Sequence, residues 1–311
     1  MSSSSAVSPC TCPLYFERGF MSTIGITGAS GNLGRATLEF LIDRGVAPAS
    51  IVAVARDPSK LAELAGRGVQ VRRADYTDVD SLEAAFRGVD KLLFISTSAL
   101  GEERMLHHRN VVSAAVNAGV KHIVYTSVVG PSASAKFAAS PGHFNTETLV
   151  KDSGIPYTFF RNNLYLDLVP LLYGSAADSG VLTHFVGDSR IGFVLRRDIA
   201  EALANILTKG DHTNRIYNIT VPGKAYSHAD IAAALSKSSG KNVRYQSVSV
   251  DEFRKALESA GLPPARVGMS VGLGEAILAG EFDHSSPDLE KLLGRAPTTV
   301  EQLLAGAKAT G

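Results

Sequence analysis

The sequence predicts an α/β protein with a doubly wound parallel sheet, the Rossmann arrangement, and a smaller, mainly helical C-terminal part that binds substrate. Two observations predict this class. Short apolar runs rich in Val, Ile and Phe alternate with segments of helical spacing, and the first run leads directly into a glycine-rich turn. Nearly continuous apolar runs are typical of strands buried on both faces of a parallel sheet, and parallel neighbours require crossover helices.

The apolar runs predict strands in the first half of the chain at residues 23–27, 51–55, 69–74, 91–96, 122–127 and 157–161. A helix is expected between the first two strands, and Gly45 and Pro48 mark its end. The residues expected on its apolar face are Leu33, Thr37, Phe40 and Leu41. These elements define a nucleotide-binding domain over residues 22–162.

The alternation stops after residue 162, and strand signals become sparse. Residues 215–221 are expected to return one strand to the sheet, whereas the rest of 163–311 has helical patterns separated by Gly and Pro. We therefore expect residues 163–311 to form most of the substrate-binding part. It would pack over the carboxyl edge of the sheet and close a cleft.

Composition limits the classes of partner. The chain of 311 residues has 45% apolar residues, 20% charged residues and a net charge of +1, without the basic excess that favours nucleic acid or acidic membranes. Both cysteines, Cys10 and Cys12, lie near the start, so neither a disulfide scaffold nor a zinc site is expected. We expect no metal and no nucleic-acid partner.

The Ser-rich segment of residues 1–21 is interpreted as a disordered extension, with a weak targeting peptide as the alternative. No run approaches the roughly 20 apolar residues of a membrane span, so we expect a cytoplasmic protein.

The stretch GITGASGNLG has glycines at three-residue intervals, Gly28, Gly31 and Gly34. Gly28 would make the turn out of the strand, Gly31 would let backbone amides approach a pyrophosphate, and Gly34 would allow close helix packing. The helix N-terminus would supply N–H donors and partial positive charge to the phosphates. The other expected contacts in this turn are Ser30, Asn32 and Leu33. A purely structural glycine turn is the alternative.

Arg56 stands at the end of the second predicted strand, where NAD-binding proteins carry an acidic residue that binds the ribose hydroxyls. Its guanidinium can pair with the 2′-phosphate of NADPH. The sequence therefore favours NADPH, while the adjacent Asp57 keeps NADH as an alternative. A solvated loop arginine is the other interpretation of Arg56.

The ordered set of motifs, including ITGASGNLG, VARDPSK, RRADYTD, GVDKLLFIS and ETLVKDSGIPYTFFRNNLY, resembles the NmrA-like group of atypical short-chain dehydrogenase/reductases. The resemblance covers residues 22 to about 305 and is closest to the members that reduce quinones and triphenylmethane dyes. It implies hydride transfer from NAD(P)H to such an acceptor. It also implies cofactor contacts at Asp75, Ser96, Thr97, Ser98, Asn162 and Asn163, with Tyr165 beside the nicotinamide.

The Tyr-x-x-x-Lys motif of the wider family, in which lysine activates the tyrosine as a proton donor, is absent: no lysine follows Tyr125, Tyr157 or Tyr165 at that spacing. A quinone relaxes this requirement because its reduced anion is stable. Positioning of the two rings would then dominate catalysis.

His143 begins the segment HFNTE, where relatives that reduce phenylpropanoids have a lysine. We expect His143 to orient or protonate substrate, with Glu147 beside it on the helix, and Tyr165 to be the second catalytic candidate. A cleft-lining histidine without a chemical role is the alternative. His107 and His108 are consecutive and therefore poor co-ligands for a metal.

The segment YLDLVPLLY predicts either an apolar wall for a flat electrophile such as a quinone or part of the core; the residues concerned are Tyr165, Leu168, Leu171 and Tyr173. A monomer and a homodimer are both compatible with the sequence. Two other functions stay open: an NAD(P) sensor without turnover, and a reductase of one biosynthetic intermediate.

Overall fold

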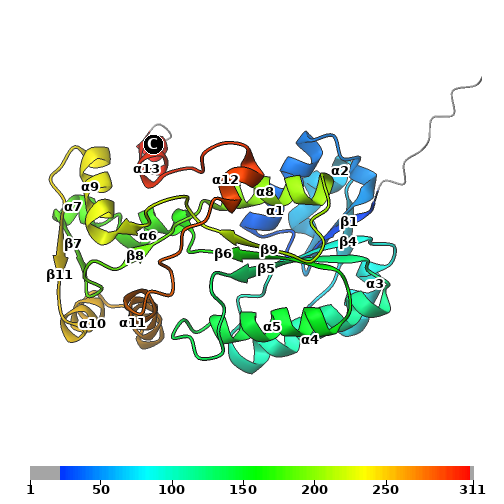
Figure 1. The fold of residues 1–311 in the computed structure, drawn as a ribbon, viewed down its shortest axis with the longest axis horizontal. Helices are drawn as coiled ribbons and strands as arrows, with labels where there is room; N and C mark the ends of the chain where they lie inside the picture. The colour runs from blue at the N-terminus through cyan, green and yellow to red at the C-terminus, as the bar shows by residue number, and fades with distance from the viewer. Residues whose placement is uncertain (1–21, 309–311) are drawn as a thin grey trace, which may run out of the picture.

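A computed structural model describes residues 22–308; the predicted disordered segment 1–21 lies outside the described residues. In this range the centre is a seven-stranded sheet of order β3-β2-β1-β4-β5-β6-β9, in which all neighbours are parallel (Figure 1). The strands are β1 (Ile24–Ile26), β2 (Ile51–Ala55), β3 (Gln70–Arg73), β4 (Lys91–Phe94), β5 (His122–Val128), β6 (Tyr157–Asn162) and β9 (Arg215–Ile219). The predicted doubly wound class is confirmed, as is the returning strand.

Helices cover both faces of the sheet (Figure 1). One face carries α1 (Asn32–Asp43), α8 (Arg196–Thr208) and α12 (Asp288–Leu293), and the other carries α3 (Val79–Phe86), α4 (Gly101–Asn117) and α5 (Ser140–Asp152). Strand β2 is buried at all five positions because apolar layers lie above and below it. Short segments complete this half: η1 (Pro48–Ser50), η2 (Pro58–Leu61) and α2 (Ala62–Gly66).

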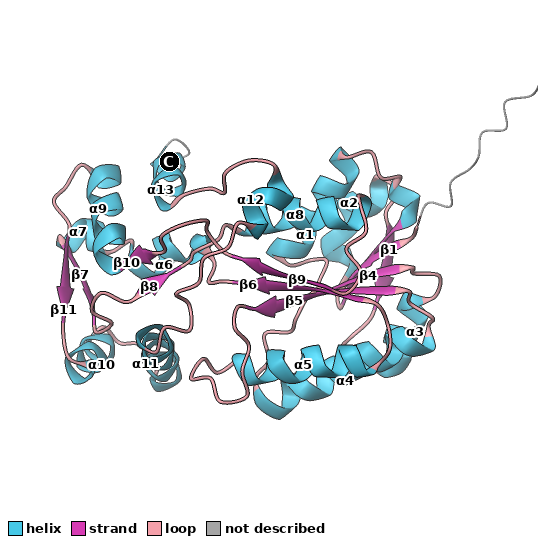
Figure 2. Ribbon diagram, in the orientation of Figure 1, coloured by secondary structure: helices cyan, strands magenta, loops and turns pink. Residues whose placement is uncertain are grey.

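The C-terminal part is mainly helical, as predicted, and it lies beyond the ends toward which β5, β6 and β9 point (Figure 2). Its helices are η3 (Leu166–Leu168), α6 (Val169–Tyr173), α7 (Ala176–Ser179), α9 (His228–Ser239), α10 (Val250–Ser259), α11 (Pro264–Leu278) and α13 (Val300–Lys308). They enclose a second core that includes Phe185, Phe253 and Phe282.

Four short strands of the C-terminal part were not predicted. Parallel β7 (Val181–His184) and β11 (Arg244–Ser247) form one pair, and antiparallel β8 (Arg190–Ile191) and β10 (Tyr226–Ser227) form another. None exceeds four residues, too short for the period of two to stand out. The chain also returns to the sheet more often than expected, because α8 and α12 join β9 there.

The carboxyl edge of the sheet is tied to the C-terminal part by polar contacts. Asn163 Nδ2 donates to Phe282 O (3.0 Å) and Thr220 Oγ1 (3.2 Å), and Gly192 N also donates to Phe282 O (3.0 Å). A Cβ at Gly192 would overlap Thr220 Oγ1, so only glycine fits there. No helix among residues 22–308 is long and apolar enough to cross a membrane.

Candidate cofactor site and active site

A cavity of about 480 Å³ lies at the carboxyl edge of the sheet, where β1 stands between β2 and β4. At this position the connections diverge to opposite sides of the sheet, and open α/β sheets bind their ligands in the resulting crevice. The predicted residues that line it are Gly28, Ser30, Gly31, Arg56, Asp75, Ser96, Thr97 and Ser98. Tyr76, Glu103 and His107 also line it and were not predicted.

The glycine turn leads directly into α1. Gly28 has φ of +60°, a left-handed conformation that glycine adopts without strain, and Gly31 N donates to Gly28 O at 3.0 Å. A Cβ on Gly34 would lie 2.5 Å from Gly28 O and 2.8 Å from Ala29 Cα. Gly34 therefore allows the helix to pack against the turn itself.

The N-terminus of α1 suits a pyrophosphate. No side chain caps this helix, and its first turn has no acidic residue. Asn32 is exposed and the Leu33 side chain enters the core, so neither lines the cavity with its side chain. Unpaired N–H groups and the positive end of the helix dipole are the features that bind phosphates elsewhere.

The end of β2 carries the candidate ribose contacts. Arg56 is exposed and lines the cavity. Asp57 instead caps η2: its Oδ1 accepts from Ser59 Oγ (2.6 Å) and Ser59 N (3.1 Å), and these bonds hold the pKa of Asp57 below its usual range. This carboxylate is thus engaged locally, and of the two neighbours only Arg56 lines the cavity.

Asp75 and Tyr76 line the same end of the cavity. Asp75 Oδ1 accepts from Thr77 N and Thr77 Oγ1, both at 2.9 Å, and hydrogen bonding by Thr77 lowers the pKa of Asp75. The Tyr76 hydroxyl donates to Ile95 O at 2.7 Å and lies 2.6 Å from Thr27 Oγ1. Burial raises the pKa of Tyr76, and the bond to Thr27 opposes that rise. The sequence signal for Tyr76 was its place beside Asp75, directly after β3.

The loop from β4 to α4 (residues 95–100, the β4–α4 loop) forms the other end of the cavity. Ser96 N donates to Thr126 Oγ1 at 2.9 Å, and Thr97 N donates to His108 Nε2 at 3.2 Å. Arg104 Nη1 donates to Thr97 O (2.9 Å) and Ala99 O (3.1 Å). The loop is therefore held by groups beneath it, while Ser98 is exposed.

The two asparagines at the end of β6 differ in their environments. Asn162 is 4% exposed, yet within residues 22–308 neither of its amide atoms has a hydrogen-bond partner. Asn163 instead uses Nδ2 to join Thr220 and Phe282 and accepts from Leu164 N at 2.8 Å. An unpartnered buried amide is costly unless a ligand satisfies it, so Asn162 is the stronger ligand contact.

His143 lies in a buried polar network. It is 7% exposed; Arg104 Nη2 lies 2.6 Å from its Nε2, and the Tyr125 hydroxyl lies 2.8 Å from its Nδ1. Burial and, secondarily, the charge of Arg104 hold its pKa well below the usual value. Because guanidinium only donates, Nε2 accepts, and the neutral ring's proton sits on Nδ1, facing the Tyr125 oxygen.

His143 and Glu147, which were expected beside each other on one helix, both lie on α5 but have different hydrogen-bond partners. Glu147 accepts bidentately from Arg161 (2.6 and 2.9 Å) and from Ser127 Oγ (2.7 Å). Although positions i and i+4 of a helix are neighbours, Glu147 turns to the cation on β6 and His143 turns to Arg104. His143 is consequently an uncharged, internally bonded residue at neutral pH.

The remaining predicted residues lie in different environments, from the buried core to the exposed surface. The Tyr165 ring lies beneath the Arg196 guanidinium, 4.3 Å from its centroid, and burial raises its pKa. Tyr173 belongs to the core, with its hydroxyl 3.1 Å from His228 Nε2, whereas Leu171 is exposed. His108 Nδ1 donates to Thr146 Oγ1 at 2.7 Å, and burial lowers its pKa to about 2.

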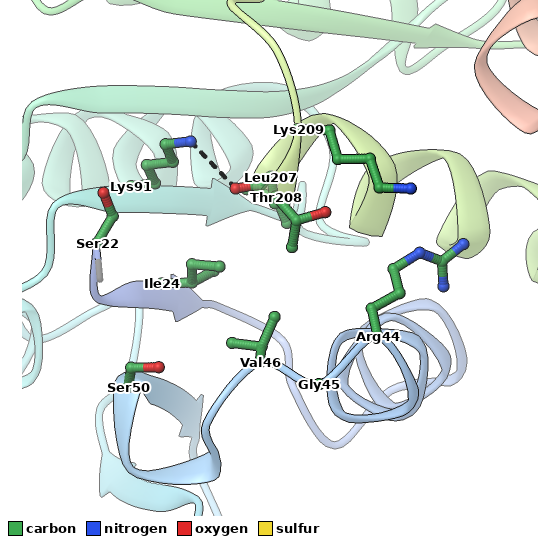
Figure 3. A pocket seen from close by; sticks show the side chains of 10 residues that line it. All are labelled: Ser22, Ile24, Arg44, Gly45, Val46, Ser50, Lys91, Leu207, Thr208 and Lys209. Carbon is green, nitrogen blue, oxygen red and sulfur yellow. Dashed lines mark hydrogen bonds between the residues drawn. The ribbon is translucent and has the colours of Figure 1, made fainter. Parts of the chain in front are cut away.

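A second cavity, of about 350 Å³, lies at the opposite, amino edge of the sheet (Figure 3). Its cations serve the ends of helices: Arg44 donates to Phe40 O at 3.2 Å, and Lys91 Nζ donates to Leu207 O at 3.1 Å. Basic groups at helix C-termini satisfy terminal carbonyls and complement the dipole. This cavity therefore has a structural explanation and lies away from the predicted site residues.

The parallel sheet, the uncapped glycine turn and the cavity above it define a dinucleotide-binding α/β protein of the Rossmann class. Within that class, the chain belongs to the NmrA-like family, whose model matches residues 21–301.

Known relatives are similar over nearly their whole length. The chain is 38% identical to quinone oxidoreductase 2 of Escherichia coli K12 over 279 residues, which is 90% of this chain and 96% of that protein. The solved structure of the E. coli NADPH-dependent quinone oxidoreductase with NADPH matches with a TM-score of 0.86 and 37% identity, covering 92% and 99% of the two chains. Citrobacter triphenylmethane reductase with NADP(H) matches with a TM-score of 0.85 and 35% identity, covering 91% and 99%.

Proposed function

We propose that the protein is an NADPH-dependent oxidoreductase that transfers hydride to a quinone or a similarly conjugated electrophile. The observation that carries the proposal is the cavity at the carboxyl edge, which joins the glycine turn, Arg56 and the β4–α4 loop. The names of two relatives, a quinone oxidoreductase and a triphenylmethane reductase, support the same class of acceptor.

The residues present fit the cofactor. Gly28 and Gly31 in the cavity lining and the uncapped N-terminus of α1 suit the pyrophosphate, and Arg56 suits the 2′-phosphate. Asn162 has an unpartnered amide for the nicotinamide side. When bound, NADPH supplies a hydride from its nicotinamide ring. The chain would hold this ring and a flat acceptor in contact.

The titratable groups at the carboxyl edge favour an acceptor that needs no strong acid. Burial raises the pKa of Tyr125 and of Tyr165, and burial lowers the pKa of His143. None of these groups has the pKa near 7 that general acid catalysis prefers. A quinone accommodates this arrangement, because the anion formed by hydride addition is stable and can take its proton from water.

The test is oxidation of NADPH, followed at 340 nm, with quinones, triphenylmethane dyes and activated alkenes as acceptors. We expect turnover with at least the quinones, and faster turnover with NADPH than with NADH. Tight NADPH binding without oxidation by any acceptor would reject the enzyme and favour a cofactor sensor. Equal efficiency with NADPH and NADH would reject the cofactor preference.

A further inference from the structure

Arg104 is a buried cation for which no counter-ion is found. It is 2% exposed, and none of the ion pairs among residues 22–308 includes it. Its hydrogen-bond partners are neutral: Thr97 O at 2.9 Å, Ala99 O at 3.1 Å and His143 Nε2 at 2.6 Å. Within residues 22–308, its Nε also has no hydrogen-bond partner. Burying a charge without an opposite charge lowers the stability of the fold. Such a residue is therefore a candidate for a functional role.

Neither Glu147 nor Glu103 neutralises this charge. Glu147 is paired with Arg161 at 2.6 Å. The Glu103 side chain is 70% exposed and faces His107, 3.9 Å from Nε2, so solvent screens it. Dipoles of carbonyl groups and the imidazole lone pair solvate Arg104 but leave its net positive charge in place.

The position of Arg104 relative to the cavity gives this charge a role. Thr97 and Ala99, the residues that its Nη1 holds, line the cavity after β4, whereas Arg56 follows β2 on the other side of β1. With the pyrophosphate on α1 and the 2′-phosphate at Arg56, the nicotinamide half would extend toward the ends of β4, β5 and β6. Arg104 Nη1 bonds directly to the loop that follows β4, at 2.9 Å from Thr97 O and 3.1 Å from Ala99 O. The field of Arg104 thus reaches this half of the site.

We propose that Arg104 sets the redox preference of the cofactor site, so that reduced NADPH binds more tightly than oxidised NADP⁺. The inference rests on the proposed function. The oxidised nicotinamide ring carries a positive charge and the reduced ring is neutral, so an uncompensated cation repels only the oxidised form. The same charge stabilises the anion that an acceptor becomes when it receives hydride. Spent cofactor would therefore leave more readily than fresh cofactor.

The size of the effect follows from Coulomb's law. A unit charge within about 10 Å of another, at an effective dielectric constant of about 20, changes an equilibrium on the order of tenfold. We therefore expect Arg104 to contribute roughly a tenfold difference between the dissociation constants of NADP⁺ and NADPH.

The experiment measures both dissociation constants by isothermal titration calorimetry with the full chain. Wild type should bind NADPH more tightly than NADP⁺. Arg104→Gln should reduce the ratio of the NADP⁺ and NADPH dissociation constants about tenfold. Arg104→Lys keeps the charge and should retain this ratio. Arg109→Gln removes an exposed charge from the same helix and should leave the ratio unchanged. Equal losses for both cofactors in Arg104→Gln would make Arg104 a positioning residue of the β4–α4 loop and overturn the proposal.

His143→Glu offers an independent route if Arg104→Gln does not fold. It keeps Arg104 but places a carboxylate where Nε2 now lies 2.6 Å from Nη2, so it should also narrow the ratio. An unchanged ratio in a folded, cofactor-binding His143→Glu protein would contradict the proposal. If wild type oxidises NADPH with quinones but shows no preference for NADPH over NADP⁺, this inference alone fails. Wild type that binds neither cofactor would fail both this inference and the proposed function.

Discussion

At the level of single residues, neighbours in sequence have separate tasks at the carboxyl edge. Arg56 lines the cavity, while Asp57 next to it caps η2 through Ser59. Asn162 has no partner for its amide, while Asn163 joins β6 to Thr220 and Phe282. The sequence makes all four residues candidates for cofactor contacts, and their hydrogen bonds separate the two members of each pair.

Arg56 should determine cofactor choice. Arg56→Asp is expected to weaken NADPH binding by roughly 1 to 3 kcal/mol, the scale of a lost charge-assisted contact, and to affect NADH less. Calorimetric titration with both cofactors measures this difference. Arg67→Asp, at another exposed arginine just after α2, should change neither affinity. Equal weakening of NADPH and NADH by Arg56→Asp would exclude Arg56 as the phosphate contact.

Asn162 and Asn163 form a matched pair for separating function from stability. Asn163→Ala should lower the free energy of unfolding by about 1 to 3 kcal/mol, because it leaves buried groups without partners. Asn162→Ala removes no hydrogen bond within the described residues and should change that free energy little, yet weaken cofactor binding or turnover. Urea unfolding and activity assays measure the two effects. A large loss of stability in Asn162→Ala would argue against a ligand contact.

At the level of elements, the junction of β1 and α1 depends on the absence of side chains. Gly34 allows α1 to pack closely against the glycine turn. A Cβ atom added at Gly34 would collide with the backbone of Gly28 and Ala29. Backbone cannot yield as a flexible side chain can. The uncapped helix start and this close packing therefore act together: they place the free N–H groups of α1 at the cavity.

Gly34→Ala should disrupt this junction. Overpacking is expected to cost about 1 to 3 kcal/mol of stability and to weaken NADPH binding, because the helix start must shift. Gly66→Ala is the control: Gly66 ends α2 with nothing within 4 Å of its added Cβ and no positive φ. Thermal unfolding and cofactor titration compare the two variants. If Gly34→Ala matched Gly66→Ala in both measurements, the close approach would not matter.

At the level of the whole molecule, segments of the C-terminal part run back to the sheet and join the two halves by hydrogen bonds. The segment around residues 281–286 crosses the edge of the sheet: Glu281 accepts from Phe137 N at 2.9 Å, and His284 O accepts from Thr220 Oγ1 at 2.8 Å. The C-terminal part in turn contains two adjacent histidines, His184 and His228, whose rings are tilted by 43° with centroids 4.6 Å apart. The protonation of these two histidines therefore affects the stability of the whole fold.

Stability should fall on acidification below about pH 6.5 because of buried histidines. Burial lowers the pKa of His184 to about 3 and of His228 to about 4, below the ordinary value of 6.5 that applies when unfolded. Between these pH values the two histidines bind protons in the unfolded chain but not in the folded chain. The free energy of unfolding present above pH 6.5 is therefore lost as the pH falls toward 4. Each histidine contributes up to about 1.4 kcal/mol per pH unit. Urea unfolding between pH 8 and pH 4.5 measures this loss, and His228→Gln should reduce its slope. A slope unchanged in that variant would exclude His228.

The C-terminal part shows where local patterns lose information. Its four short strands pair across long separations, as β7 with β11, so their sequences alone carry no clear period. His143 illustrates the same limit for the site: the sequence placed it on a helix beside Glu147, but Arg104, located 39 residues earlier, fixes its ring. No sequence motif indicates Arg104. Its burial without a counter-ion, which only the folded structure shows, distinguishes it from other arginines on helices.

The sequence by itself determined the doubly wound class, the alternation of strands and helices in the first half of the chain, the glycine turn and the candidacy of Arg56. These follow from local periodicity and from residues whose function depends on their immediate neighbours in the chain. The tertiary structure decided that Asp57 is a cap, that Asn162 and not Asn163 has an unpartnered amide, and that His143 is neutral and internal. Hydrogen bonding, burial and charge compensation at these positions depend on residues distant in sequence, and only folding brings those together.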